Sequence, residues 1–183
     1  MKTIAVIVGS LRKDSLNKKL AQAVEALAKD LWTCRYADIG ALPLYNEDLW
    51  PSPPAPVGAL KQLIESSDGV LVVTPEYNRS VPGVLKNALD WASRPSGKSS
   101  FKHKPAAVLG ASSGQVGTAV AQAHLRGILG PSGATPMQSP EVYITAKEGL
   151  FDAGGAITDE KIRANIQKHI DAFDAWIARL SPD

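Results

Sequence analysis

Three short segments of the sequence concentrate side chains that could bind a ligand. The first, GSLRKDSLN, covers residues 9–17 and combines hydroxyls, an amide and a guanidinium. The second, PEYNRSVPG, covers residues 75–83 and places an acid, an aromatic ring, an amide and a base between two prolines. The third, GASSGQVGT, covers residues 110–118 and is rich in serine and glycine. A connecting turn does not need this many polar groups, so all three segments are candidates for a binding site.

Residues 9–17 have the chemistry of an anion site. They lead from an apolar run into a helical pattern, and the first turn of a helix presents unpaired N–H groups and the positive end of its dipole. Ser10, Ser15 and Asn17 add neutral donors, and the Arg12 guanidinium suits phosphate. Alternatively, Ser15 only caps the helix and Arg12 is solvated. Without a GxGxxG or GxxxxGK[ST] pattern, a monophosphate fits better than a dinucleotide or a triphosphate.

Residues 75–83 have groups that suit a flat ring. Tyr77 offers a flat face with a hydroxyl, and Asn78 offers a paired donor and acceptor, as a heterocycle with ring nitrogens and carbonyls requires. We place Glu76 at the rim of the site, because a carboxylate is an unusual core residue. Pro82 marks the first turn of the next helix. The alternative is an ordinary turn with Tyr77 packed on the surface.

Residues 110–118 also match G-x-S-x-G, the nucleophile elbow of α/β-hydrolases, with Ser112 as the nucleophile. The base would then be His124 or His169. His124 falls in the next predicted helix and His169 in a long C-terminal one, whereas a triad histidine usually lies on a late, exposed loop. No HGGG-like segment accompanies the motif. We therefore favour a donor-rich turn that closes over a ligand ring, and keep a small serine hydrolase as the alternative.

Short apolar runs and longer helical patterns alternate along the chain. Five apolar, β-branched runs are predicted strands, at residues 3–8, 31–36, 69–73, 105–109 and 135–144. Helical patterns follow them at residues 17–29, 57–66, 81–92, 115–129 and 158–180. Thr158 is positioned as the N-cap of the last helix. This alternation predicts βα units around a parallel sheet, and the first, third and fourth strands are apolar enough to be central.

The predicted fold is one α/β domain over residues 1–183. Hydrophobic residues make up 44% of the chain and charged residues 21%, as in globular proteins. Five βα units fit a three-layer, doubly wound, flavodoxin-like fold with a five-stranded parallel sheet in the order 2-1-3-4-5. Ligands of such sheets lie beyond the carboxyl ends of the strands, where the strand order switches. The three candidate segments should meet at that edge.

Composition excludes several other classes of protein. The net charge is +2 and basic residues are spread along the chain, so nothing favours a nucleic-acid partner. The apolar runs are far shorter than the roughly 20 residues of a membrane span. Met1 and Lys2 precede a strand-like run rather than a secretory signal, so we expect a cytoplasmic protein without a membrane partner. Cys34 is the only cysteine, which excludes an internal disulfide and a cysteine-based metal cluster.

Together, the three segments resemble the NADPH-dependent FMN reductase family, flavodoxin-like enzymes that include bacterial quinone, azo-dye and chromate reductases. The matching patterns are G-S-x-R-x-x-S-x-N at residues 9–17, P-E-Y-N-x-S-x-P-G-x-L-K-N-A-L-D-W at residues 75–91, and the weaker G-x-S-x-G-x-x-G-T at residues 110–118. The second pattern is long and specific. The likeness extends through about the fourth predicted helix and is least specific toward the C-terminus.

The resemblance implies an FMN-dependent NAD(P)H oxidoreductase. In such enzymes NADPH or NADH delivers a hydride to the flavin and leaves, and a quinone or another acceptor, such as chromate, an azo dye or a metal ion, then collects the electrons. This ping-pong chemistry needs no catalytic side chain. The residues that the resemblance implies around FMN are Ser10, Arg12, Ser15, Leu16 and Asn17 at the phosphate, Pro75, Glu76, Tyr77 and Asn78 along the ring, and Ser112, Ser113 and Gly114 on its other side.

The resemblance also implies a homodimer or homotetramer, with the helix that starts at Val81 at the subunit contact. Trp91, at the end of that helix, suits either this interface or the core. A non-enzymatic electron carrier of the flavodoxin type would use the same fold. The near-neutral charge argues mildly against it, because such carriers usually have a strongly acidic surface.

Overall fold

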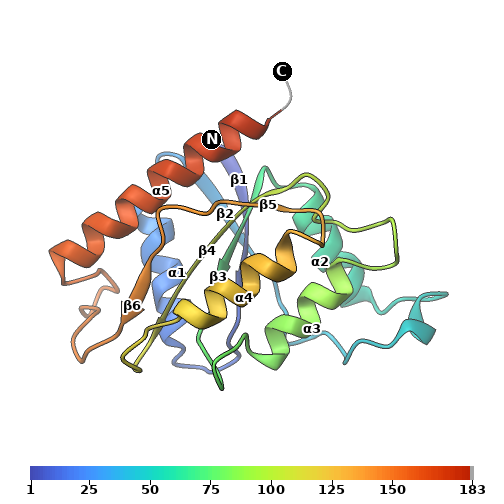
Figure 1. Ribbon diagram of the computed structural model, residues 1–183, viewed down its shortest axis with the longest axis horizontal. Coiled ribbons are helices and arrows are strands. Elements are labelled where there is room, and N and C mark those ends of the chain that lie inside the picture. The colour runs from blue at the N-terminus through green and yellow to red at the C-terminus, as the bar shows by residue number, and fades with distance from the viewer. Residues whose placement is uncertain (182–183) are drawn as a thin grey trace.

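A computed structural model of the chain describes residues 1–181 and shows a sheet between two layers of helices (Figure 1). The strands are β1 (Lys2–Val8), β2 (Trp32–Tyr36), β3 (Gly69–Val73), β4 (Pro105–Ser112), β5 (Thr135–Pro136) and β6 (Tyr143–Thr145). The helices are α1 (Leu16–Leu27), α2 (Ala55–Glu65), α3 (Gly83–Ala92), α4 (Ala119–Leu129) and α5 (Glu160–Leu180), and a 3-10 helix spans Glu47–Leu49.

The strand order confirms the predicted doubly wound fold. All strand pairs are parallel, and the order is β2-β1-β3-β4-β5. Val8 of β1 lies opposite Val73 of β3, and Val73 lies opposite Leu109 of β4. The three central strands therefore end close together, and the segments that follow them begin at one edge of the sheet.

Two apolar cores, one on each face of the sheet, fix the positions of these strands. Ile4 and Val6 of β1 belong to the core covered by α1 and α5, while Ala5 and Ile7 belong to the core covered by α2, α3 and α4 (Figure 1). This alternation follows the period of a strand, in which successive side chains point to opposite faces. Every residue of β3 is buried, as expected for a central parallel strand.

Trp91 is a core residue. Its side chain is fully buried, its Nε1–H donates to the Pro43 carbonyl at 2.8 Å, and its ring packs edge-on against Tyr45 and Trp50. The interface role considered for Trp91 is therefore wrong, because this side chain has no exposed surface to offer a partner.

The predicted fifth strand, residues 135–144, is two short strands. β5 pairs with the first residues of β4, and β6 pairs with its last residues. Pro136 and Pro140 have no backbone N–H to donate, so a continuous ladder cannot form across this stretch. As a result, Thr145 lies opposite Ser112, at the edge of the sheet where the third candidate segment begins.

All five helices start one to four residues away from their predicted starts, and two of these differences have a clear local cause. α4 begins at Ala119 rather than at residue 115, because Gly117 has a φ of +58° and residues 114–118 form a turn. The N-cap of α5 is Asp159, whose carboxylate accepts the Ile162 N–H at 2.9 Å. Thr158 instead donates its hydroxyl to the Gly149 carbonyl at 2.7 Å. Within residues 1–181, no helix has both the length and the apolar character that crossing a bilayer requires.

Candidate functional site

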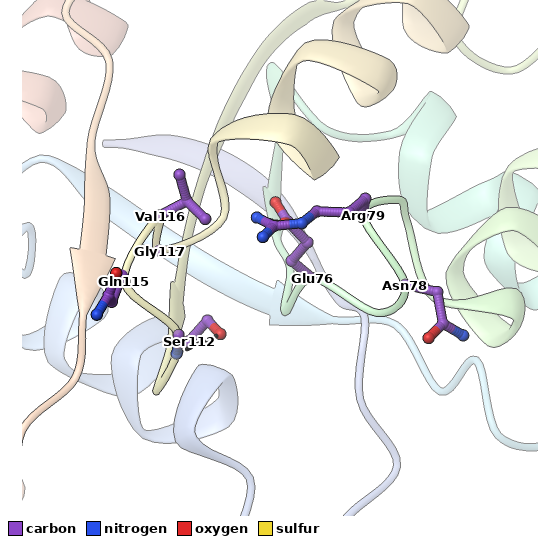
Figure 2. Close-up of a pocket in the computed structure, with 8 residues that line it drawn as sticks. Glu76, Asn78, Arg79, Ser112, Gln115, Val116 and Gly117 are labelled. Atoms are coloured by element: carbon purple, nitrogen blue, oxygen red, sulfur yellow. Dashed lines mark hydrogen bonds and ion pairs between the residues drawn. The ribbon is translucent and has the colours of Figure 1, made fainter.

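The second and third candidate segments face each other across a cavity beyond the edge of the sheet (Figure 2). The cavity has a volume of about 830 Å³, within the range of small-molecule sites. It is lined by Glu76, Asn78, Arg79, Ser112, Gly114, Gln115, Val116 and Gly117. Pro75, Tyr77 and Ser113 belong to the same segments but lie outside this lining. The structure therefore brings together four of the residues expected around the ring: Glu76, Asn78, Ser112 and Gly114.

Residues 77–80 form a tight hairpin on one side of the cavity. The Tyr77 N–H donates to the Ser80 carbonyl at 3.0 Å, and the Ser80 N–H donates to the Tyr77 carbonyl at 2.9 Å. Asn78 and Arg79 at the tip have φ values of +49° and +58°, as both central residues of a type I′ turn must. Asparagine adopts this conformation readily, whereas for arginine it is costly and must be held by its surroundings.

Glu76 holds the hairpin against α4. Its Oε2 accepts the backbone N–H groups of Val120 and Ala121, both at 3.0 Å, and the side chain is only 7% exposed. The side chain of Thr118, the N-cap of α4, makes no capping hydrogen bond, and its Oγ1 instead accepts from Gln122 Nε2 at 2.8 Å. Glu76 therefore caps α4 from another segment, and its charge lies at the positive end of the helix dipole. The rim position expected for Glu76 is wrong, since this side chain is buried and bound.

A second contact joins the hairpin to the same helix. The Ser80 Oγ lies 3.1 Å from Nδ1 of His124, which is on the second turn of α4. With Glu76 and Ser80 both bonded to α4, the hairpin and the third segment form one connected wall around the cavity. The hairpin is thereby fixed before any ligand arrives.

Arg79 lies at the mouth of the cavity. Its Nη1 is 3.5 Å from Glu76 Oε1, and its side chain is 68% exposed. Figure 2 shows this side chain pointing from the hairpin toward the turn that carries Val116 and Gly117. The sequence interpretation missed Arg79 because it occupies a variable position of the PEYN-x-S pattern. Its positive charge, within a segment already selected as a candidate binding site, could have identified Arg79 from the sequence.

Ser112 does not have the surroundings of a hydrolase nucleophile. Its Oγ accepts the Gly114 N–H at 3.1 Å, and within residues 1–181 no histidine is hydrogen-bonded to it. His124 is bonded to Ser80 instead. His169 is buried, with Nδ1 2.8 Å from the Pro140 carbonyl, and burial lowers the pKa of its ring. Neither histidine proposed as a base is placed to act on Ser112.

The first segment approaches the same edge without lining the same cavity. Ser15 is the N-cap of α1, and its Oγ accepts the Lys18 N–H at 3.2 Å, which confirms the capping interpretation. Ser10 and Arg12 line a smaller cavity of about 370 Å³, which Lys13 and Lys18 also border. The sequence interpretation did not consider these two lysines. Asp38 lines the same cavity, so three basic side chains and one acidic side chain border it.

Asn17 links the first segment to the third. Its Nδ2 donates to the Ala111 carbonyl and its Oδ1 accepts the Ala111 N–H, both at 2.9 Å. Ala111 directly precedes Ser112, so the start of α1 is fixed beside the third segment. Asn17 is itself buried, so these two bonds fix its amide in the interior between the two segments.

Two glycines allow the three segments to start side by side. A Cβ at Gly110 would lie 2.0 Å from the Thr74 carbonyl oxygen, and one at Gly9 would lie 3.0 Å from the Leu85 side chain. Contacts below 3.0 Å with backbone cannot be relieved by a rotamer change. Only glycine at position 110 lets β4 and the end of β3 approach this closely.

Comparison with known proteins agrees with this geometry. The profile of the NADPH-dependent FMN reductase family matches residues 2–149. The chain is 51% identical to a 2-hydroxy-1,4-benzoquinone reductase from a Burkholderia species, over 95% of both chains. It is 46% identical to an NAD(P)H-dependent FMN reductase from Pseudomonas aeruginosa, over 95% of this chain and 94% of that one. The solved structure of FerB, a flavoenzyme NAD(P)H:(acceptor) oxidoreductase from Paracoccus denitrificans, superposes with a TM-score of 0.94 at 50% identity, over 98% of both chains.

Proposed function

Because the chain belongs to the NADPH-dependent FMN reductase family, we propose that it binds FMN and uses NAD(P)H to reduce quinone-type acceptors. The observation that carries the proposal is the family match over residues 2–149, which includes all three candidate segments. When bound, FMN supplies the redox chemistry, taking a hydride from the nicotinamide and giving electrons to the acceptor. The residues of the chain then serve to bind, orient and shield.

The start of α1 suits the phosphate of FMN. Helix geometry leaves the backbone N–H groups of Leu16 and Asn17 without an acceptor inside the helix, and the first turn contains no acidic residue. The hydroxyls of Ser10 and Ser15 and the Arg12 guanidinium add donors at the same place. A dianionic phosphate matches both these donors and the positive end of the helix dipole.

The large cavity suits the ring. We place the isoalloxazine between the hairpin segment, Pro75 to Asn78, and the turn at Ser112, Ser113 and Gly114. The contacts that hold both walls are internal to the protein: Glu76 to α4, Ser80 to His124, and Asn17 to Ala111. A ring that enters therefore meets a preformed slot, which lowers the entropy cost of binding.

We also propose that the protein assembles as a homodimer or homotetramer through α3 and α4. A groove of about 650 Å³ runs between these helices, and small, exposed residues of both line it: Gly83, Ala123 and Gly127. Small residues let another backbone approach closely. Analytical ultracentrifugation tests the assembly, and a single monomeric species at micromolar concentration would contradict it.

A simple experiment tests the FMN proposal. The purified protein, or the protein after incubation with FMN and desalting, should be yellow, and anaerobic NADPH should bleach the flavin absorbance. Adding a quinone should restore the colour. A protein that retains no FMN would refute the proposal, and a bound flavin that NADPH leaves oxidised would indicate an electron carrier instead.

A further inference from the structure

Within the proposed function, on which this inference rests, we propose that Arg79 makes the enzyme prefer electron acceptors that carry a negative charge. The acceptors we propose are ionised hydroxyquinones. Arg79 would be a specificity-determining residue, since it would touch the acceptor without taking part in electron transfer.

The cavity lining contains two ionisable side chains, Glu76 and Arg79. The negative charge of Glu76 is already compensated, because its carboxylate is buried and accepts two N–H groups at the positive end of α4. The remaining lining residues are neutral. The formal charges of the lining sum to zero, but the Glu76 carboxylate is buried against α4, so the charge exposed at the cavity mouth is that of Arg79.

Most of the Arg79 guanidinium is available to a ligand. Its one contact to Glu76, at 3.5 Å, lies at the outer limit of a hydrogen bond, and the side chain is 68% exposed. A guanidinium has five N–H donors, so several remain for an anion. Glu76 orients this side chain without consuming it.

The hairpin holds Arg79 in place before a ligand arrives. The left-handed conformations of Asn78 and Arg79 and the paired backbone of Tyr77 and Ser80 fix where the Arg79 side chain begins. The side chain then points across the cavity toward Val116 (Figure 2). An acceptor that enters between the hairpin and the facing turn therefore passes the guanidinium.

An ionised hydroxyquinone has the shape that this fork recognises. It is a vinylogous carboxylate, whose negative charge is shared between the oxygens on C2 and C4. The C2 oxygen lies beside the C1 carbonyl oxygen, and a guanidinium can donate to this adjacent pair in the ring plane. In the overall reaction NAD(P)H, the hydroxyquinone anion and two solvent protons become NAD(P)⁺ and neutral benzenetriol. Of the three hydrogens that the quinone anion gains, two are the solvent protons and the third arrives as the hydride, which also carries both electrons. Since Arg79 is partly exposed and screened by salt, we expect a preference of about fivefold.

The test compares two acceptors in wild type and in Arg79→Gln. The measured quantity is the ratio of kcat/KM for 2-hydroxy-1,4-benzoquinone, ionised at neutral pH, to that for the neutral 2-methoxy-1,4-benzoquinone. This ratio should fall about fivefold in Arg79→Gln and recover only in part in Arg79→Lys, which keeps the charge but loses the planar fork. Lys161→Gln removes an exposed charge at the start of α5 and should leave the ratio unchanged. An unchanged ratio in Arg79→Gln overturns the inference.

Binding without turnover gives an independent readout. Calorimetry on the FMN-loaded, oxidised protein should show benzoate binding more tightly than its neutral isostere benzamide, and Arg79→Gln should abolish the difference. If Arg79→Gln folds poorly, added KCl should still lower wild-type kcat/KM for the anionic quinone more than for the neutral one. Equal salt dependence for the two quinones overturns the inference.

The phosphates of NAD(P)H are the other anions that could reach Arg79. In ping-pong kinetics kcat/KM for NADPH is measured separately from that for the acceptor. A loss confined to NADPH, with the quinone ratio unchanged, would assign Arg79 to the dinucleotide and overturn the acceptor preference. A wild-type protein that retains no FMN refutes the proposed function itself, whereas normal bleaching by NADPH with an unchanged ratio refutes only this inference.

Discussion

The N-termini of α1 and α4 reach the same edge of the sheet, but only the N-terminus of α4 is bound by a carboxylate of the protein itself. At α4 the protein supplies its own anion, because Glu76 binds the N–H groups of Val120 and Ala121. At α1 the neutral Ser15 caps a single N–H and no acid occupies the first turn. Both helix ends could attract a phosphate. Under the proposed function, the N-terminus of α1 remains open to the FMN phosphate. The N-terminus of α4 is capped by Glu76 and forms part of the cavity wall.

Gly110→Ala should disturb this arrangement most, because it pushes apart β3 and β4, the strands that are followed by Glu76 and by the start of α4. The new Cβ would lie 2.0 Å from the Thr74 carbonyl oxygen, so β3 and β4 must separate where both segments begin. We expect a loss of about 3 kcal/mol or more in the free energy of unfolding, measured by urea denaturation. Gly58→Ala is the matched control, since its Cβ meets nothing within 4 Å in α2. That variant should gain about 0.5–1 kcal/mol, and equal behaviour of the two would contradict the packing argument.

The sequence predicts the parts of this arrangement that depend on local pattern. Continuous apolar runs identify β1, β3 and β4, and the parallel order then places the three segments at one edge. The residues after these strands stand out by their chemistry, and Ser15 is a candidate cap because capping is local. The meeting of the three candidate segments near one edge of the sheet therefore follows from the amino-acid sequence alone.

Contacts between distant segments could not be predicted in the same way. Glu76 meets α4 across 44 positions of sequence, and this contact exists only because the hairpin folds back onto the helix. The carboxylate was therefore assigned to the rim. The split of the fifth strand has another cause, since Pro136 and Pro140 interrupt a run that is otherwise apolar enough for a strand. Arg79 was overlooked because a family pattern gives no weight to its variable positions.

The second prediction removes the anion that the protein supplies to α4. Glu76→Ala leaves the N–H groups of Val120 and Ala121 without their acceptor, and should lower the free energy of unfolding by about 1–2 kcal/mol. Glu76→Gln keeps an acceptor oxygen but loses the charge, so its loss should be about half as large. Urea unfolding followed by circular dichroism measures both.

The same variant tests whether the two helix ends become alike. With Glu76 gone, α4 offers an open anion site, so added sulfate should stabilise Glu76→Ala more than it stabilises wild type. Glu76→Gln serves as the control, because its amide still occupies the helix end. If sulfate raises the stability of all three proteins equally, Glu76 does not occupy an anion site at the N-terminus of α4.

The third and smallest effect concerns the open end at α1. Arg12 is exposed beside the first turn of α1, where it adds one charge-assisted contact to those of the backbone N–H groups. Arg12→Ala should therefore weaken FMN binding by about fivefold, measured by quenching of flavin fluorescence. Riboflavin, which has the same ring without the phosphate, should bind wild type and Arg12→Ala equally. A variant that loses affinity for both ligands to the same extent would place Arg12 near the ring, and the phosphate would then rest on the α1 backbone and the hydroxyls of Ser10 and Ser15 alone.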